Sequence, residues 1–330
     1  MHQRCHTRHL RVGMYVILPL KWWEHPFARN QFLISSEDLL QRVRDCIDGD
    51  VLVDPDRCEM PADGQPASAS PAPADASAEA ECCAERLHDV VHDTKLPPAR
   101  KAHAIRQHSR VLMKSVLEEP TAPSIGAAKK AIGAIADLIV ADRATAFSLL
   151  SVSAHDFQTY AHSVSVGLYG VSLASQVYEG GSGHNLRELG AAFFLHDLGK
   201  TRVPTEIIRK PGRLDNNELA IMRTHPEHSY DILCETATAT EECRIIALQH
   251  HERSAGGGYP LGLEGDSIHE YARICSIADV FDALVARRPY KRPLTPFEAL
   301  SMMRDRMMGH FSRPLFEGFV RMFASQRKAA

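Results

Sequence analysis

A stretch of small and polar residues divides this chain into two parts. Residues 61–80 read PADGQPASASPAPADASAEA and contain no Val, Ile, Leu, Met or aromatic residue. A segment of this composition buries too little apolar surface to offset the entropy of ordering, so we expect a flexible linker there. The chain on each side of it must build its own hydrophobic core. A length of 330 residues suits two such units.

The part before the linker, residues 1–60, reads as a small α+β domain. A serine at position 35 or 36 can cap the amphipathic helix that follows it, with Leu39, Leu40 and Val43 on one face. Short apolar runs around this helix predict strands. These runs are Val12–Ile17, Gln31–Ile34 and Val51–Val53.

The part after the linker predicts a mainly α fold. Helix-period segments alternate with short loops, and we expect helices over Ala99–Leu117 and from a cap at Ser124 through Ile139. Residues 81–146 would form connecting helices, and residues 147–330 would form one helical bundle domain.

Composition excludes several classes of protein. Apolar residues make up 44% of the chain and charged residues 24%, and the formal net charge is −3, whereas nucleic-acid-binding domains are usually strongly basic. We therefore expect no nucleic acid polymer as partner. No apolar run is long enough to span a membrane, and no secretory signal is visible. The eight cysteines form no C-x-x-C pair, which favours reduced thiols in the cytoplasm.

Histidine is over-represented, and its distribution points to a metal site. Of the 18 histidines, eight lie between His155 and His251. Five helical segments each carry His or Asp on an otherwise apolar face, where such groups are costly unless they are paired or bound to metal. Imidazole with carboxylate suits Fe, Mn, Co, Ni or Zn. The residues concerned are His162, His196, Asp197, His225, His250, His251 and Asp279.

The order of these motifs resembles the HD-GYP subgroup of the HD metal-dependent phosphohydrolases. The blocks run H…HDLGK…HP…HHER-x-x-G-x-GYP…ADVFDAL…RPYK between Phe147 and Phe323. Residues 10–60, with VGMYVI…WWEHPF…QFLISS, resemble a small domain that often precedes HD-GYP domains in bacterial proteins. The resemblance implies a helical HD-type bundle that holds metal ions and hydrolyses the bacterial second messenger cyclic di-GMP to pGpG, and sometimes on to GMP.

The resemblance also assigns roles to residues. The seven His and Asp residues named above would be the metal ligands, with Asp197 bridging two metals, and His196, Asp197 and Lys200 would be catalytic. Lys200 would contact the scissile phosphate, and Arg288 and Lys291 would hold phosphates or guanine edges. Tyr259 belongs to a substrate-side loop that is linked in the family to contacts with diguanylate cyclase (GGDEF) domains.

Two positions depart from the pattern of the family. Gln158 stands where relatives with three metals carry a Glu ligand, so we expect two divalent transition metal ions, Fe or Mn, and pGpG as the main product. Ala255 stands where the family usually has Asp, which removes a carboxylate that would fix the loop.

Three functions remain open from the sequence. The first is a cyclic di-GMP phosphodiesterase. The second, which Ala255 favours, is a weakly active or inactive module that binds cyclic di-GMP or a diguanylate cyclase partner. The third is another HD phosphohydrolase acting on a dNTP or an alarmone, and the GYP block after His251 argues against it.

Overall fold

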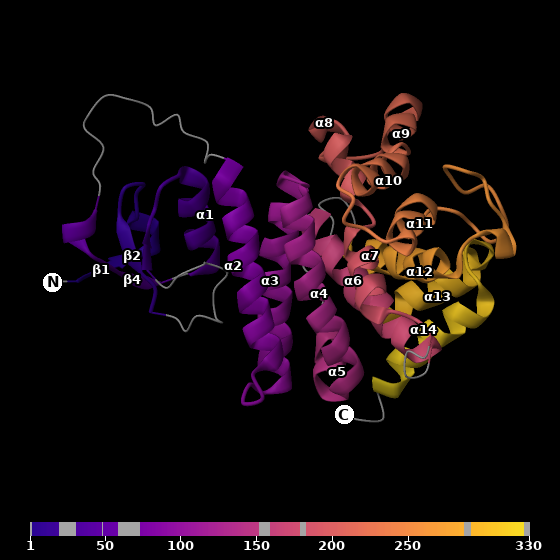
Figure 1. Ribbon diagram of the computed structural model, residues 1–330, viewed down its shortest axis with the longest axis horizontal. Coiled ribbons are helices and arrows are strands. Elements are labelled where there is room, and N and C mark those ends of the chain that lie inside the picture. Colours follow the sequence, from indigo (N-terminus) through magenta and orange to yellow (C-terminus); the bar gives the residue numbers. More distant parts are fainter. Residues whose placement is uncertain are drawn as a thin grey trace.

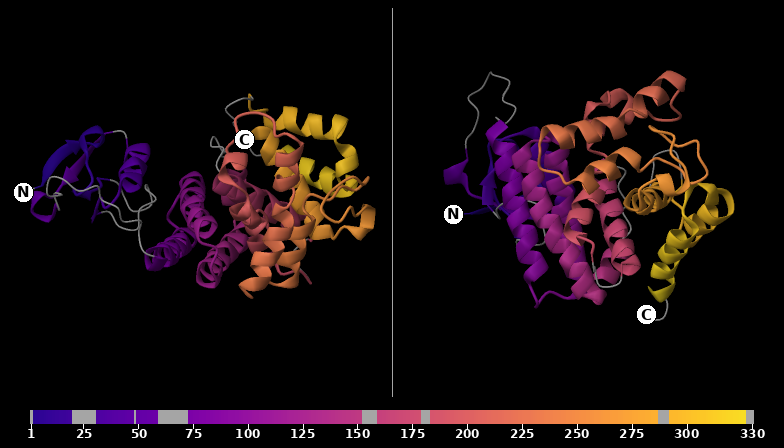
Figure 2. Two further views of the ribbon diagram at one scale, coloured as in Figure 1. Left: turned by 90° about the horizontal axis from the view of Figure 1, so that it is seen from above. Right: turned by 45° about the vertical axis from the view of Figure 1, so that its right-hand side comes forward.

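The chain forms a small β-sheet followed by a long succession of helices. The computed structural model describes residues 2–19, 31–47, 49–58, 73–151, 159–178, 183–286 and 292–326. Figure 1 shows the sheet at one end of an elongated molecule, helices α2 to α4 side by side in the middle, and α6 to α14 at the other end; the view from above in Figure 2 agrees. The predicted mainly α fold with a small N-terminal α+β part is confirmed.

The N-terminal sheet is antiparallel and has the strand order β1-β4-β2-β3. Helix α1 (Glu37–Cys46) packs its apolar face, with Leu40 and Val43 buried, against Val16 and Val51 of the sheet. The side chain of Ser36 accepts a hydrogen bond from the backbone of Leu39 and so begins the helix. The strands are β1 (Gln3–His6), β2 (Tyr15–Ile17), β3 (Gln31–Leu33) and β4 (Asp50–Val53).

One prediction in this region needs correction, and one strand was not predicted. The strand expected from Val12 begins only at Tyr15, because Gly13 adopts a positive φ of 90° in a turn and its N–H is donated to Ile34. Strand β1 was not predicted, since its exposed, polar sequence QRCH lacks an apolar alternation. The motif WWEHPF lies outside the described residues.

The end of the segment expected to be a linker is helical. Helix α2 (Pro73–His92) includes residues 73–80, where alanine and glutamate favour a helix. From Ala80 onward the helix has a buried face, with Leu87 and Val90 fully covered, and it packs on α3 (Pro98–Glu118) and α4 (Ala122–Ala141). Helix α2 therefore begins within a stretch whose composition predicts disorder, and its described buried face starts at Ala80. Residues 59–72 lie outside the described part of the chain.

Helices α3 and α4 agree with the predicted positions, with one change of cap. Thr121, not Ser124, is the N-cap of α4: its hydroxyl accepts from the backbone of Ser124, and Ser124 Oγ accepts from the backbone of Thr121. The short helix α5 (Arg143–Ser151) packs on α3 and α4.

The C-terminal helices surround one buried core that is continuous with α2 to α5. Gly167 on α6 allows the closest approach to α7, because a Cβ at that position would lie 1.9 Å from the ring of Phe194. Helix α12 packs on the same helix α6. The bounds are α6 (Thr159–Val177), α7 (Leu186–Leu195), α8 (Thr205–Ile208), α9 (Asn216–Met222), α10 (His225–Glu235), α11 (Glu241–Gln249), α12 (Glu270–Val285), α13 (Pro296–Arg306) and α14 (Arg313–Gln326).

Among the described helices, none has both the length and the apolar content required to cross a bilayer.

Candidate metal centre

Segments from five parts of the C-terminal bundle bring His and Asp side chains together around Asp197. This residue lies between α7 and the short 3-10 helix Leu198–Arg202, and its carboxylate is fully buried. The surrounding residues come from the first turn of α6, the end of α7, the start of α10, the end of α11 and the middle of α12. They are His162, His196, His225, His250, His251 and Asp279.

The two carboxylate oxygens of Asp197 face different imidazoles. Oδ1 lies 3.1 Å from Nε2 of His225 and 3.7 Å from Nε2 of His250. Oδ2 lies 3.4 Å from Nε2 of His196 and 3.5 Å from Nε2 of His162. This division of partners is what a carboxylate that bridges two cations requires.

Asp279 connects the two sides of the cluster. Its Oδ1 lies 3.0 Å from Nε2 of His162, and its Oδ2 lies 3.7 Å from Nδ1 of His251. The potential ligand atoms form two compact groups, each spanning no more than 4.8 Å. One group is Asp197, His225, His250 and His251; the other is His162, His196 and Asp279.

Three of the imidazoles are oriented by their own helical turn. In each of His196, His225 and His250, Nδ1 lies 2.7–2.9 Å from the carbonyl oxygen of the residue three positions earlier. Nδ1 must therefore carry the proton and donate it, which leaves a lone pair on Nε2 directed at Asp197. The accepting carbonyls belong to Phe193, Met222 and Ala247.

This arrangement fits a bound cation. Nε2 of His225 lies 3.3 Å from Nε2 of His250 and 3.2 Å from Nε2 of His251, so nitrogen lone pairs converge on one small space. Nε2 of His196 is buried and has no hydrogen-bond partner within the described part of the chain. Lone pairs that face one another and a carboxylate repel, and divalent transition metals satisfy imidazole and carboxylate donors together.

The pKa shifts within the cluster distinguish charged side chains from neutral ones. Burial lowers the pKa of His162, but hydrogen bonds to Asp279 and Asp282 outweigh it and raise the pKa to about 10. Burial raises the pKa of Asp197, yet the positive charge of Lys200 and the contact with His196 hold it well below its usual range. A metal that binds here meets an ionised carboxylate and displaces the proton of His162.

The other two perturbed imidazoles are neutral. Burial lowers the pKa of His225, in spite of its contact with Asp197, and burial together with the neighbouring His250 lowers the pKa of His251 well below its usual range. Neutral imidazole is the form that binds metals.

A close backbone approach holds Asp197 beside α10. A Cβ on Gly199 would lie 2.1 Å from the carbonyl oxygen of His225 and 2.3 Å from the backbone nitrogen of Ser229. The N–H of Gly199 donates to Ser229 Oγ at 2.7 Å. Only glycine fits at this position of the HDLGK block, because any side chain would push Asp197 away from His225.

The loop after α11 places Tyr259 beside the cluster. The ring of Tyr259 stacks on His251 with centroids 4.7 Å apart, and the guanidinium of Arg223 lies 5.2 Å from the centre of the tyrosine ring. The buried carboxylate of Glu252 accepts hydrogen bonds from the backbone N–H groups of Leu261, Gly262 and Leu263. Glu252 thus holds the far end of the loop.

The position of Ala255 explains how the loop is held without a carboxylate there. Ala255 is exposed, and its backbone N–H donates to the carbonyl of Gly309 at 2.8 Å, next to a bond from Ser254 to His310. Backbone contacts and Glu252 together fix the loop.

The remaining predicted site residues divide into two sets. The ammonium of Lys200 donates a charge-assisted hydrogen bond to Oδ2 of Asp197, and its side chain is 22% exposed at the rim of the cluster. Arg288, Lys291 and Gln158 lie outside the described residues.

The sequence analysis missed Asp282. Its buried Oδ2 lies 2.7 Å from Nδ1 of His162, on the side of the ring away from Asp279. A carboxylate behind a metal-binding imidazole fixes the orientation of the ring. Its position three residues after Asp279, on the same face of α12, was the available signal.

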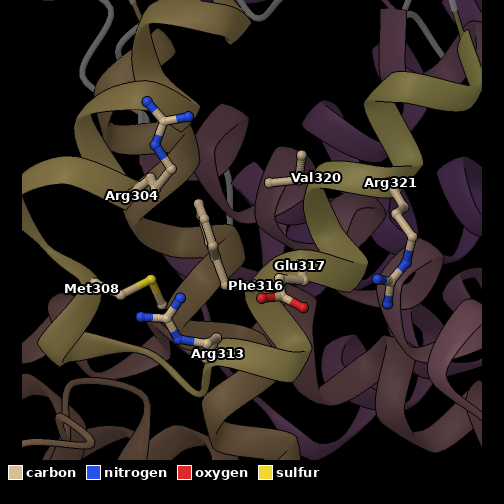
Figure 3. Close-up of a pocket in the computed structure, with 7 residues that line it drawn as sticks. All are labelled: Arg304, Met308, Arg313, Phe316, Glu317, Val320 and Arg321. Atoms are coloured by element: carbon tan, nitrogen blue, oxygen red, sulfur yellow. The ribbon is translucent and has the colours of Figure 1, made fainter.

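A separate hollow of about 320 Å³ lies between α13 and α14. Figure 3 shows that the guanidinium groups of Arg304, Arg313 and Arg321, which line it, point in different directions, and Arg304 is paired with Asp305. These cations do not converge on one ligand position. The His and Asp cluster around Asp197 is therefore the candidate active site.

Helices that bring imidazoles to a shared, buried carboxylate define the class of HD-domain metal-dependent hydrolases. Residues 178–314 match the HD domain family, and residues 2–123 match a domain of unknown function, DUF3391. His162 lies before the matched HD segment. The chain belongs to the HD-GYP family of HD-domain proteins, as its motifs predicted.

Several curated relatives are similar in sequence to this chain over different lengths. The cyclic di-GMP phosphodiesterase PA4108 of Pseudomonas aeruginosa is 30% identical over 325 residues, which cover 97% of this chain and 76% of the relative. The cyclic di-GMP phosphodiesterase response regulator RpfG of Xanthomonas campestris pv. campestris is 42% identical over 123 residues, 37% of this chain and 32% of the relative. The 3'3'-cGAMP-specific phosphodiesterase 2 of Vibrio cholerae is 37% identical over 196 residues, 59% of this chain and 37% of the relative.

A solved structure supports the fold over nearly the whole chain. Bd1817, an HDG"Y"P protein from Bdellovibrio bacteriovorus, aligns with a TM-score of 0.65 and 16% identity, and the alignment covers 98% of this chain and 100% of Bd1817.

Proposed function

We propose that this chain is a metal-dependent phosphodiesterase that hydrolyses cyclic di-GMP. The observation that carries the proposal is the buried carboxylate of Asp197, whose two oxygens face separate pairs of imidazoles. The relatives named as cyclic di-GMP phosphodiesterases support the choice of substrate. The relative named for 3'3'-cGAMP makes that dinucleotide the competing substrate to test.

The proposed ligands serve two divalent transition metal ions. His225, His250 and His251 would hold one, His162, His196 and Asp279 would hold the other, and Asp197 would bridge them. Fe or Mn is the metal that we expect, and mixed imidazole and carboxylate ligands suit both. A third ion is not expected, since Gln158 offers only a neutral amide oxygen.

The side chains have distinct proposed roles in the reaction. When bound, two such cations lower the pKa of a water molecule and neutralise the charge of a phosphodiester. Lys200 would donate to a phosphate oxygen that becomes more negative in the transition state, and its position at the rim supports this role. Asp282 would keep Nε2 of His162 directed at the cluster.

Further residues would bind the substrate. Tyr259 offers a ring face beside His251, and Arg288 and Lys291 would hold phosphates or guanine edges. The loop of Tyr259 is also the proposed contact for a diguanylate cyclase domain. A cytoplasmic location stays a prediction from the composition.

The direct test is an assay of the full chain, purified and loaded with Mn²⁺ or, under anaerobic conditions, Fe²⁺. We expect cyclic di-GMP to be converted mainly to pGpG, faster than 3'3'-cGAMP, with about two metal ions bound per chain. Conversion of 3'3'-cGAMP alone would overturn the substrate assignment. Tight binding of cyclic di-GMP without turnover by the metal-loaded protein would favour the non-catalytic module.

A further inference from the structure

A buried hydroxyl on α10 contacts the turn that carries Asp197. This turn is closed by a hydrogen bond of 3.0 Å from the N–H of Lys200 to the carbonyl oxygen of Asp197. The N–H of Gly199, inside the turn, donates instead to Oγ of Ser229 at 2.7 Å. Gly199 is buried and Ser229 is 0% exposed, and within the described part of the chain this N–H has no other acceptor. The Ser229 hydroxyl therefore satisfies the one backbone donor that the turn directs at α10.

The same helix holds the turn at a second point. Ser229 follows His225 by four residues, so the two side chains lie on the same face of α10, one helical turn apart. Nε2 of His225 lies 3.1 Å from Oδ1 of Asp197. One contact alone would leave the turn free to pivot. Two contacts, one to the side chain of Asp197 and one to the backbone N–H of Gly199, fix the orientation of the turn.

An exposed contact joins the same two elements further along α10. Nη2 of Arg202, at the end of the 3-10 helix, lies 2.6 Å from Oε2 of Glu235, and the two side chains are 38% and 60% exposed. Exposed ion pairs contribute little, whereas a buried N–H that loses its acceptor is costly. Removal of the Ser229 hydroxyl should therefore shift the turn, and Asp197 with it.

We propose that Ser229 is a positioning residue, which sets the carboxylate of Asp197 against His225 for metal binding. The proposal rests on the metal centre described under the proposed function. It goes beyond the proposed ligands, because Ser229 would control metal affinity without touching metal or substrate.

The test is the Mn²⁺ affinity of the full chain, measured by competition with a fluorescent chelator. Ser229→Ala removes only the hydroxyl and keeps a residue that favours a helix. We expect it to weaken Mn²⁺ binding roughly 10-fold, the lower end of the usual effect of losing a contact behind a metal ligand. Wild-type affinity in this variant would overturn the proposal.

A matched control separates positioning from general stability. Thr145 on α5 is also fully buried, and its hydroxyl donates to Oδ2 of Asp142 at 2.6 Å. Thr145→Val removes this hydroxyl and keeps the size of the side chain. It should lower thermal stability and leave the Mn²⁺ affinity unchanged. An equal loss of affinity in Thr145→Val and Ser229→Ala would overturn the proposal.

Two further variants test whether the hydroxyl itself matters. Arg202→Ala breaks the exposed contact between the 3-10 helix and α10, and it should keep the wild-type Mn²⁺ affinity. Ser229→Cys keeps a side chain of similar size but offers sulfur, a weak acceptor, so it should bind Mn²⁺ more tightly than Ser229→Ala and less tightly than the wild type. A Cys variant that binds more weakly than the Ala variant would show that side-chain size matters rather than the acceptor, and would overturn the proposal.

The two proposals fail in different ways. A wild-type chain that binds no Mn²⁺ would overturn the metal centre itself. A wild-type chain that binds Mn²⁺, beside a Ser229→Ala variant of equal affinity, would overturn the role of Ser229 alone.

Discussion

Nδ1 of His162 donates a hydrogen bond to Oδ2 of Asp282 over 2.7 Å, and this contact ties α6 to α12. The ring then presents its other nitrogen to Asp279 at 3.0 Å. Two carboxylates on successive turns of one helix therefore hold a single imidazole from both sides.

Asp282→Ala should weaken metal binding without removing a ligand. Loss of a carboxylate behind a metal-binding imidazole typically costs 10- to 100-fold in affinity, and we expect a loss of about that size for Mn²⁺. The control is Asp266→Ala, since Asp266 is 98% exposed and pairs only at the surface with Arg273. Equal Mn²⁺ affinities for the two variants would show that Asp282 does not orient His162.

Replacing His196 and Asp197 together with Ala should strip most of the bound metal. The two oxygens of Asp197 face imidazoles of different groups, so its loss should weaken both positions. The chain offers a matched control in His88 and Asp89, an adjacent His-Asp pair exposed on α2. Metal analysis by mass spectrometry should show unchanged content in the His88→Ala/Asp89→Ala variant. Unchanged content in the first variant would refute the site.

Lys200→Ala should lower turnover far more than metal content. Loss of one charge-assisted contact to the transition state costs about 2.7–4 kcal/mol, or roughly a hundred- to a thousandfold in rate. Metal content should persist, because removal of the ammonium leaves Asp197 free to bind cations. Arg202→Ala is the control, since Arg202 lies in the same 3-10 helix and pairs with Glu235 at the surface. Near-normal kcat for Lys200→Ala would show that Lys200 does not stabilise the transition state.

Glu252→Ala should loosen the loop that carries Tyr259. The substitution removes a carboxylate that accepts three backbone hydrogen bonds, and a hydrogen bond to a charged group contributes about 1.5–3 kcal/mol. Hydrogen exchange of residues 255–264 should therefore become faster.

Ala255→Asp should change neither exchange nor turnover, since position 255 is exposed. A large gain in turnover from Ala255→Asp would mean that the missing carboxylate matters after all.

Limited proteolysis should cut the chain first between residues 61 and 72. This segment carries no large apolar side chain, and it precedes the buried face of α2. We propose that residues 73–330 remain folded as one unit after cleavage, separate from a domain formed by residues 1–60. Earlier cleavage within α2 to α5 would refute this division.

The proposed metal ligands were easier to predict from the sequence than the contacts that support them. The proposed ligands were recognisable because each interrupts an apolar helical face, and the structure brings all seven together. Asp282 was not recognised as part of the site. Its partner His162 lies 120 residues away in the chain, so only the folded arrangement reveals the contact.

Local composition also gave wrong predictions for where α2 and α4 begin. Residues 73–80 have the same small and polar composition as residues 61–72, and the burial of Ala80 and Leu87 against α3 and α4 is a tertiary effect. Thr121 rather than Ser124 is the N-cap of α4. Ser124 occupies the third helical position, and its hydroxyl completes the reciprocal capping box with Thr121.

The HD match begins at residue 178, yet His162 precedes that boundary. The segment that matches the HD family and the segment that builds the cluster are thus different pieces of chain. Helix α6, which carries His162, packs on α3, so the part of the chain before residue 178 supplies both a proposed ligand and the helix that supports it. A gene fusion made at residue 178 should therefore yield a protein with a defective site.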